Sequence, residues 1–256
     1  MGGPAMVSQR QERVWRLIAD SAQVRGEPMS VVDVCVVCMR VLAADGVGVS
    51  LLDDGRLEPV QARGELGREL LEAELTSGDG PCVEAALVGG PVLAADLGDA
   101  ESERRWPLFT AAAHAGNVAA AFAFPLLTGT ARIGVLVACR DSPGPLDAAQ
   151  YRDALLLADA AVTLLLDQPA TVRVHSGGDV SNGAEWGEEV MAADWLALGA
   201  EVHQAAGMVS VQLKCTVEQA LARLRAYAFA HDVPVTRVAA RVVARTLRFD
   251  PDTTPR

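Results

Sequence analysis

Lysine is nearly absent from this 256-residue chain, since Lys214 is the only one and arginine supplies the other basic residues. We attribute this skew to genomic base composition. The loop Gly78-Asp79-Gly80 lacks the following Gly-Lys-Ser/Thr that a phosphate-binding loop needs. Histidine is also scarce, and none of the four pairs with a Ser or Cys nucleophile at a recognisable spacing. The sequence therefore predicts that the protein is not an enzyme.

Long hydrophobic runs are missing as well. The most apolar one, Ala154–Leu166, is shorter than a bilayer-spanning helix and contains Asp159. The N-terminus lacks the charged start and apolar core of a signal peptide. We expect a cytoplasmic protein that does not enter a membrane.

The cysteines are few and scattered, and their number is odd. Cys35 and Cys38 have the spacing of a redox pair, but they lie inside an apolar helical run instead of at a helix N-terminus. No second pair completes a zinc site. We expect buried thiols in a reducing compartment, with a sensing role at Cys82 as a minor alternative. His114 is a weak candidate for haem ligation, and haem is not expected. The full set is Cys35, Cys38, Cys82, Cys139 and Cys215.

Charge is divided unevenly along the chain, whose net charge is −11. Residues 1–200 carry 14 arginines against 28 acidic residues, whereas residues 201–256 carry eight basic and five acidic ones. A basic segment on an acidic protein indicates that one end of the molecule meets a polyanion.

Four arginines near the C-terminus follow helical spacing. Arg237, Arg241, Arg245 and Arg248 are four, four and three residues apart, so on a helix they would share an arc of about 80°. The alternative is a merely solvated arginine face.

The first two thirds of the chain predict an α+β domain over residues 1–167. Helices are expected first, then an antiparallel sheet with interspersed helices, then a closing helix. Asp53-Asp54-Gly55 predicts a tight hairpin turn. The expected helices are 8–24, 30–44, 65–76, 83–88, 104–115 and 146–166, and the expected strands are 47–52, 57–62, 91–95, 118–126 and 132–139.

Residues 168–190 contain Gly177, Gly178, Gly183 and Gly187 together with Pro169, Ser181 and Asn182, and predict a linker. Residues 191–256 then show a purely helical pattern. Thr216-Val217-Glu218-Gln219 matches a capping box, and Pro234 suits the first turn of another helix. The pattern predicts an all-α bundle of three helices.

The bundle resembles an ANTAR domain. The residues that carry this resemblance are His203-Gln204-Ala205-Ala206-Gly207-Met208, Thr216-Val217-Glu218-Gln219-Ala220, Leu224-Arg225-Ala226-Tyr227-Ala228, Val238-Ala239 and Val242-Val243. The resemblance implies a transcription antiterminator that binds stem-loops in nascent RNA. Because the Gly-rich linker separates the bundle from the domain before it, we expect loose coupling between them. The candidate RNA contacts are Arg225, Arg237, Arg241, Arg245, Arg248, Gln204, Lys214 and Arg223.

The N-terminal domain resembles the GAF domains that precede ANTAR domains in actinobacterial regulators. The residues concerned are Gly80-Pro81-Cys82, Gly90-Pro91-Val92, Asp96-Leu97, Arg105-Trp106-Pro107, Phe124-Pro125-Leu126 and Ile133-Gly134-Val135-Leu136. The resemblance implies a sensor that binds a small molecule of unknown identity. The candidate pocket residues on its strands are Val49, Leu51, Phe122, Phe124, Val135 and Val137, and the alternative is that they only fill the core.

Together these features predict a dimeric regulator in which the GAF-like sensor controls RNA binding by the ANTAR-like bundle. Residues 8–24 and 147–167 are expected to form the dimer, so that two modules can engage two hairpins. Two other classes stay open. Three small basic helices also suit a DNA-binding regulator, and a helical bundle can bind a protein partner.

Overall fold

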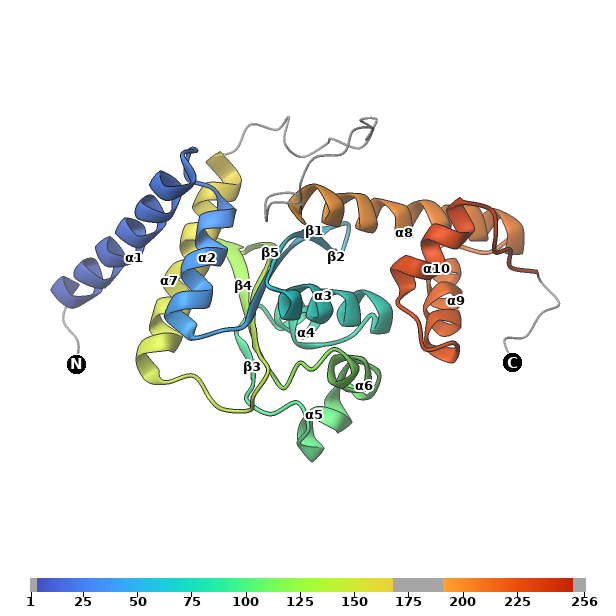
Figure 1. Cartoon of the computed structure of the whole chain (residues 1–256), viewed down its shortest axis with the longest axis horizontal. Coiled ribbons are helices and arrows are strands. Elements are labelled where there is room, and N and C mark those ends of the chain that lie inside the picture. Colours follow the sequence, from blue (N-terminus) through green and yellow to red (C-terminus); the bar gives the residue numbers. More distant parts are fainter. Residues whose placement is uncertain (1–3, 168–190, 251–256) are drawn as a thin grey trace.

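The computed structural model describes residues 4–167 and 191–250. We call residues 4–167 the sheet region and residues 191–250 the bundle (Figure 1). The predicted linker at 168–190 lies outside the described residues. The elements are α1 (Pro4–Arg25), α2 (Val31–Leu42), β1 (Gly46–Asp53), β2 (Arg56–Arg63), α3 (Glu65–Ser77), α4 (Pro81–Val88), β3 (Val92–Ala94), α5 (Ala100–Arg105), α6 (Pro107–Ala115), β4 (Ala120–Thr128), β5 (Ala131–Arg140), α7 (Ala148–Asp167), α8 (Met191–Leu213), α9 (Val217–Ala230) and α10 (Val235–Val243).

The sheet is antiparallel, with strands in the order β2-β1-β5-β4-β3. β1 and β2 form a hairpin, in which Asp53 pairs with Arg56 across a two-residue turn. Asp54 and Gly55 both have positive φ angles, 45° and 79°, as a tight hairpin turn of this kind requires. The predicted turn and α+β class are confirmed.

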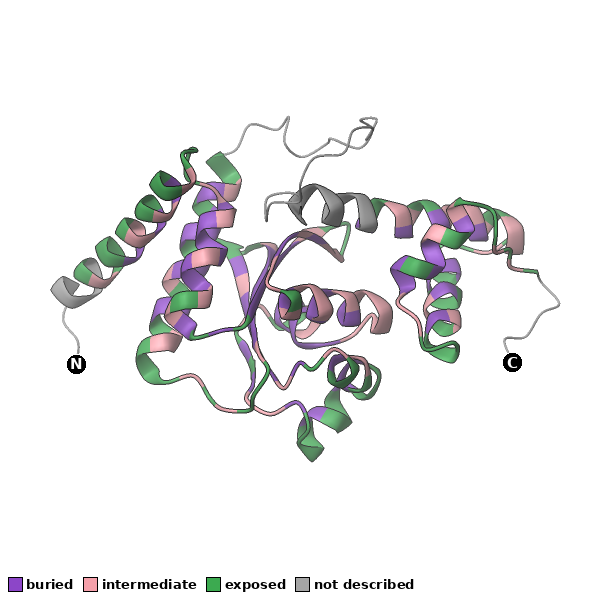
Figure 2. Ribbon diagram, viewed as in Figure 1, coloured by how far each residue is buried: buried purple, intermediate pink, exposed green. Residues whose placement is uncertain are grey.

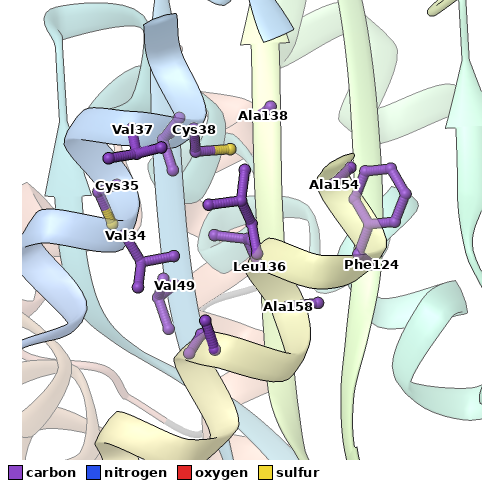
Figure 3. Close-up of a cluster of buried hydrophobic side chains, with 14 of the residues drawn as sticks. Val34, Cys35, Val37, Cys38, Val49, Phe124, Leu136, Ala138, Ala154 and Ala158 are labelled. Carbon is purple, nitrogen blue, oxygen red and sulfur yellow. The ribbon is translucent and has the colours of Figure 1, made fainter. Parts of the chain in front are cut away.

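Helices cover both faces of the sheet (Figure 2). Each face has its own apolar core. α1, α2 and α7 cover one face; among the residues packed there are Val34, Phe124 and Leu136 (Figure 3). α3, α4 and α6 contribute to the core on the other face, which includes Leu71 and Phe109. This division follows from the alternation of side chains along each strand.

α3 approaches β1 unusually closely, because two glycines face each other. A Cβ atom added at Gly46 would lie 2.1 Å from the backbone nitrogen of Gly67. A Cβ atom at Gly67 would in turn lie 2.6 Å from the Val47 carbonyl oxygen. This contact fixes the start of α3, whose other end reaches the bundle.

The bundle has a separate apolar core, formed by residues such as Val209, Leu224 and Val238. The predicted capping box is present at the start of α9. The Thr216 hydroxyl accepts a hydrogen bond from the Gln219 backbone N–H (3.2 Å), and the Thr216 backbone N–H donates to Gln219 Oε1 (3.1 Å). The predicted helical region after the sheet is confirmed.

One helix prediction needs correction. Residues 104–115 were expected to form a single helix, but they divide between α5 and α6 at Trp106, where φ is −136°. Pro107 explains the division, because the ring of a proline disfavours helical backbone in the residue before it.

Candidate functional site

The bundle packs against the sheet region along the hairpin strand β2 and the C-terminal half of α3. Arg225 in α9 donates a hydrogen bond from Nε to the Leu75 carbonyl oxygen of α3 (2.9 Å). The Val235 backbone N–H at the start of α10 donates to Thr76 Oγ1 (3.1 Å), and the neighbouring Thr236 hydroxyl donates to a Glu72 carboxylate oxygen. Specific polar contacts therefore hold the two regions together.

A charged pair joins α8 to β2. His203 Nε2 lies in hydrogen-bond contact with the Glu58 carboxylate. This contact raises the pKa of His203 above its ordinary value, against burial and the nearby charges of Arg56 and Arg225, which lower it. A second pair, between Arg56 of β2 and Glu218 of α9, measures 3.5 Å. The docking contact therefore includes a histidine whose pKa is raised by its carboxylate partner.

A cavity of about 310 Å³ lies between the two regions. It is lined by residues of β1, β2, α3, α4 and β5 from the sheet region and of α8 and α9 from the bundle. This volume is at the lower end of the range of ligand pockets. The residues facing it include Leu52, Leu57, Leu71, Leu75 and Val83, together with Val202 and Leu221 of the bundle.

Glu74 is the most unusual residue around the cavity. It is buried on the apolar side of α3, and Oε1 accepts a hydrogen bond from the Cys82 backbone N–H (2.7 Å). Burial raises the pKa of Glu74 to about 7, with that hydrogen bond acting in the opposite direction. The carboxyl group is therefore partly protonated at neutral pH.

The six predicted pocket residues do not line this cavity. Val49, Phe122 and Phe124 are buried in the core beneath α2 and α7, while Val135 and Val137 are buried in the core on the opposite face. Leu51 is half-buried on β1 and does not face the cavity. The structure thus places a cavity between the regions, at positions that strand alternation alone does not indicate.

Seven of the eight predicted RNA contacts are exposed. Their side chains lie on the bundle surface, and among the described residues none of the basic ones forms an ion pair. These residues are Gln204, Lys214, Arg223, Arg237, Arg241, Arg245 and Arg248. The eighth, Arg225, is half-buried against α3, and burial lowers its pKa, with the charge of Arg56 acting in the same direction.

The sequence predicts that four arginines share one face of a helix, and the structure corrects this prediction, because only two of the four lie on a helix. α10 ends at Val243, so only Arg237 and Arg241 stand on it. Arg245 has a φ of 59°, and its N–H donates to the Val242 carbonyl oxygen (3.0 Å) while the next N–H donates to the Arg241 carbonyl oxygen (2.9 Å). This is a helix-ending motif that usually has glycine at the position of Arg245. Arg248 follows the turn.

The other chemical candidates are placed as follows. Cys35, Cys38, Cys82 and Cys139 are buried free thiols, and burial raises their pKa values, that of Cys35 to about 12. Thiolates, the reactive form, are therefore rare at these positions. His114 is exposed at the end of α6 and does not face the cavity.

Neither a metal site nor a membrane span is found within the described ranges. No group of three or more His, Cys, Asp or Glu side chains there could hold a metal ion. No helix in the same ranges is both long and apolar enough to cross a bilayer.

Comparisons with solved structures return three informative neighbours. A domain of a protein described as a two-component sensor histidine kinase from Sinorhizobium meliloti 1021 is 21% identical, with a TM-score of 0.42 over 55% of this chain and 91% of that one. The GAF domain of an Acinetobacter phosphoenolpyruvate-protein phosphotransferase is 13% identical, with a TM-score of 0.44 over 68% and 100%. A free methionine-R-sulfoxide reductase from Neisseria meningitidis is 17% identical, with a TM-score of 0.39 over 62% and 86%.

The chain is similar in part to GAF domains. At these identities and TM-scores the likeness decides neither activity nor ligand, and the neighbours themselves include an enzyme as well as a domain from a sensor kinase. No protein-family model matches the chain, and no curated protein matches it. The ANTAR resemblance of the bundle therefore stays a prediction.

Proposed function

We propose that the protein is a regulator whose bundle binds RNA stem-loops in nascent transcripts, as a transcription antiterminator, under the control of a GAF-like sensor region. The observation that carries this proposal is the exposure of five arginines of the bundle: Arg237 and Arg241 on α10, Arg245 and Arg248 after it, and Arg223 on α9.

Arginine suits such a surface because its planar guanidinium can bond two phosphate oxygens and can stack on an unpaired base. The guanidiniums of these five arginines form no ion pair with a described residue. Phe229, whose side chain is 55% exposed on α9, adds an aromatic ring that could stack on a base. Charge and an exposed ring together favour a nucleic acid over a protein partner.

Control by the sensor follows from the docking contact. Arg225 is one of the predicted RNA contacts, yet its Nε atom is hydrogen-bonded to Leu75 and its side chain is half-buried against α3. In the docked arrangement this guanidinium lines the cavity between the two regions and is not on the open surface of the bundle, so it is less accessible to an RNA backbone than its exposed neighbours are. We therefore expect the docked state to bind RNA more weakly than an undocked one.

The test compares two triple variants of the full chain that lose the same charge. One is Arg237→Gln, Arg241→Gln and Arg245→Gly, and its matched control is Arg40→Gln, Arg104→Gln and Arg105→Gln, exposed arginines of the sheet region outside the helices expected to form the dimer. Each is titrated with a tandem stem-loop RNA at about 50 and about 200 mM salt. The first variant should lose at least about tenfold in affinity and have a shallower salt dependence, and the control should match the parent. Equal affinities for all three proteins would remove the basis of the proposal.

A further inference from the structure

The cavity between the sheet region and the bundle is lined by both apolar and charged side chains. The walls come from both regions, for example Leu57 and Leu71 on one side and Leu221 on the other. The lining also includes three guanidiniums, those of Arg56, Arg132 and Arg225, of which only that of Arg56 pairs with a carboxylate of a described residue, Glu218 of α9 (3.5 Å). A molecule that fills this space would therefore contact both leucine side chains and guanidinium groups.

The carboxylates at the cavity do not balance these guanidiniums. Glu58 is engaged by His203, and Glu74 is buried and hydrogen-bonded to the Cys82 backbone. The raised pKa of Glu74 reduces its negative charge near neutral pH further. Positive charge is thus in excess around the cavity.

Two of the guanidiniums keep donors available. Arg132 uses only one terminal nitrogen, Nη1, for hydrogen bonds to the Ala86 and Leu87 carbonyl oxygens at the end of α4 (3.0 and 2.7 Å). Arg225 uses only Nε, toward Leu75. Among the described residues, no hydrogen bond engages the other nitrogens of either side chain, and neither pairs with a carboxylate. Guanidinium groups of this kind favour oxyanions with two accepting oxygens.

We propose that this cavity is the binding site of a small amphipathic anion, an organic molecule whose apolar body lies between the leucines of the two regions and whose carboxylate, sulfonate or phosphate contacts Arg132 and Arg225. Because its walls belong to both regions, the ligand binds the docked arrangement and stabilises it by mass action. The inference does not depend on RNA binding and shares only Arg225 with the predicted RNA contacts.

Two dyes of nearly the same shape test this proposal with the full chain and no RNA present. 1-Anilinonaphthalene-8-sulfonate carries the anionic group, and N-phenyl-1-naphthylamine is the same molecule without it. The fluorescence titration should show saturable binding of about one sulfonate dye per chain, and at least about tenfold weaker binding of the neutral dye, since a charge-assisted hydrogen bond is lost.

Two variants locate the site. Arg132→Gln, in the sheet region, and Arg225→Gln, in the bundle, should each weaken binding of the sulfonate dye by about tenfold. The control Arg104→Gln removes an exposed arginine of α5, away from the cavity, and should leave the affinity unchanged. Equal affinity for the two dyes, no saturable binding, or unchanged affinity in both cavity variants would overturn the proposal.

Discussion

The Nε–H of Arg225 donates a hydrogen bond to the carbonyl oxygen of Leu75, 2.9 Å away, and so joins the middle of the bundle to the end of α3. The two residues are 150 positions apart in the chain. A Cβ atom at Gly78 would lie 2.4 Å from a terminal nitrogen of Arg225, so the guanidinium lies directly against the turn that ends α3. The docked arrangement can therefore be tested by substituting the single residue Arg225.

Arg225→Gln should loosen the docking of the bundle. The shorter amide side chain cannot reproduce the guanidinium contact, and loss of one such hydrogen bond costs roughly 1 kcal/mol or more. Hydrogen–deuterium exchange of the full chain should then become faster in α3 residues near Leu75 and in β2. Arg223→Gln, an exposed residue two positions earlier on α9, is the control and should leave exchange unchanged. Identical exchange in both variants would mean that Arg225 does not hold the contact.

Docking should also depend on pH through His203. The Glu58 carboxylate raises the pKa of His203 above 6.5, so the pair stabilises the contact fully below about pH 6.5. The contribution is lost as the pH rises through the folded-state pKa, because the neutral ring no longer attracts the carboxylate. Exchange in β2 should therefore become faster with rising pH, after correction for the intrinsic rate. His203→Gln should remove this dependence; if the variant retains it, another group is responsible.

The buried Glu74 predicts a second pH effect, on global stability. Its pKa is raised from 4.5 to about 7 in the folded chain, so folding favours the protonated form. Stability is then unaffected below about pH 4.5, falls as the pH rises toward 7, and stays reduced above it, by roughly 3 kcal/mol at most.

Glu74→Gln keeps an oxygen for the Cys82 backbone N–H and removes the titration. The variant should be more stable than the parent near pH 8 and close to it near pH 5 in chemical denaturation. Glu103→Gln, which removes an exposed carboxylate of α5, is a control for loss of a negative charge. A constant stability difference between Glu74→Gln and the parent at the two pH values would show that Glu74 does not titrate in this range.

A substitution at Arg245 can remove a positive charge without lowering the stability of the fold. Its positive φ of 59° is strained for a non-glycine residue, by about 1–2 kcal/mol. Arg245→Gly relieves this strain, offset in part by the greater freedom of glycine in the unfolded chain. The variant should be at least as stable as the parent in thermal unfolding, yet bind RNA several-fold more weakly. Full RNA affinity in this variant would place Arg245 outside the RNA-binding surface.

The parts of the fold that were predictable are those set by local chemistry. Asp54-Gly55 can adopt the positive φ angles of a tight hairpin turn, and Thr216 with Gln219 supplies the acceptors that cap α9. Both features depend on neighbours within a few positions, so a sequence reveals them directly.

The end of α10 could not be predicted in the same way. Neither glycine nor proline marks it, and Arg245 takes a backbone conformation that its residue type disfavours. The helical period of the arginines thus continued in the sequence beyond the point where the helix stops. The exposure of these side chains was nevertheless consistent with the pattern, since the turn leaves them at the surface.

The cavity and the docking contacts arise between residues far apart in sequence. His203 meets Glu58 across 145 positions, and no periodicity in either segment indicates this pairing. One local signal was available: Glu74 follows Leu70 and Leu71 on the buried side of α3, and a carboxylate at such a position is costly unless it has a partner. That signal points to a site but does not identify what lies opposite it.

The most direct measurement is a titration of the full chain with tandem RNA stem-loops at about 50 and about 200 mM salt, with and without excess duplex DNA. The account predicts binding that weakens steeply at the higher salt and survives the DNA competitor. Displacement by DNA would instead indicate a DNA-binding regulator. Absence of binding at both salt concentrations would contradict the RNA-binding role and favour a protein partner for the bundle.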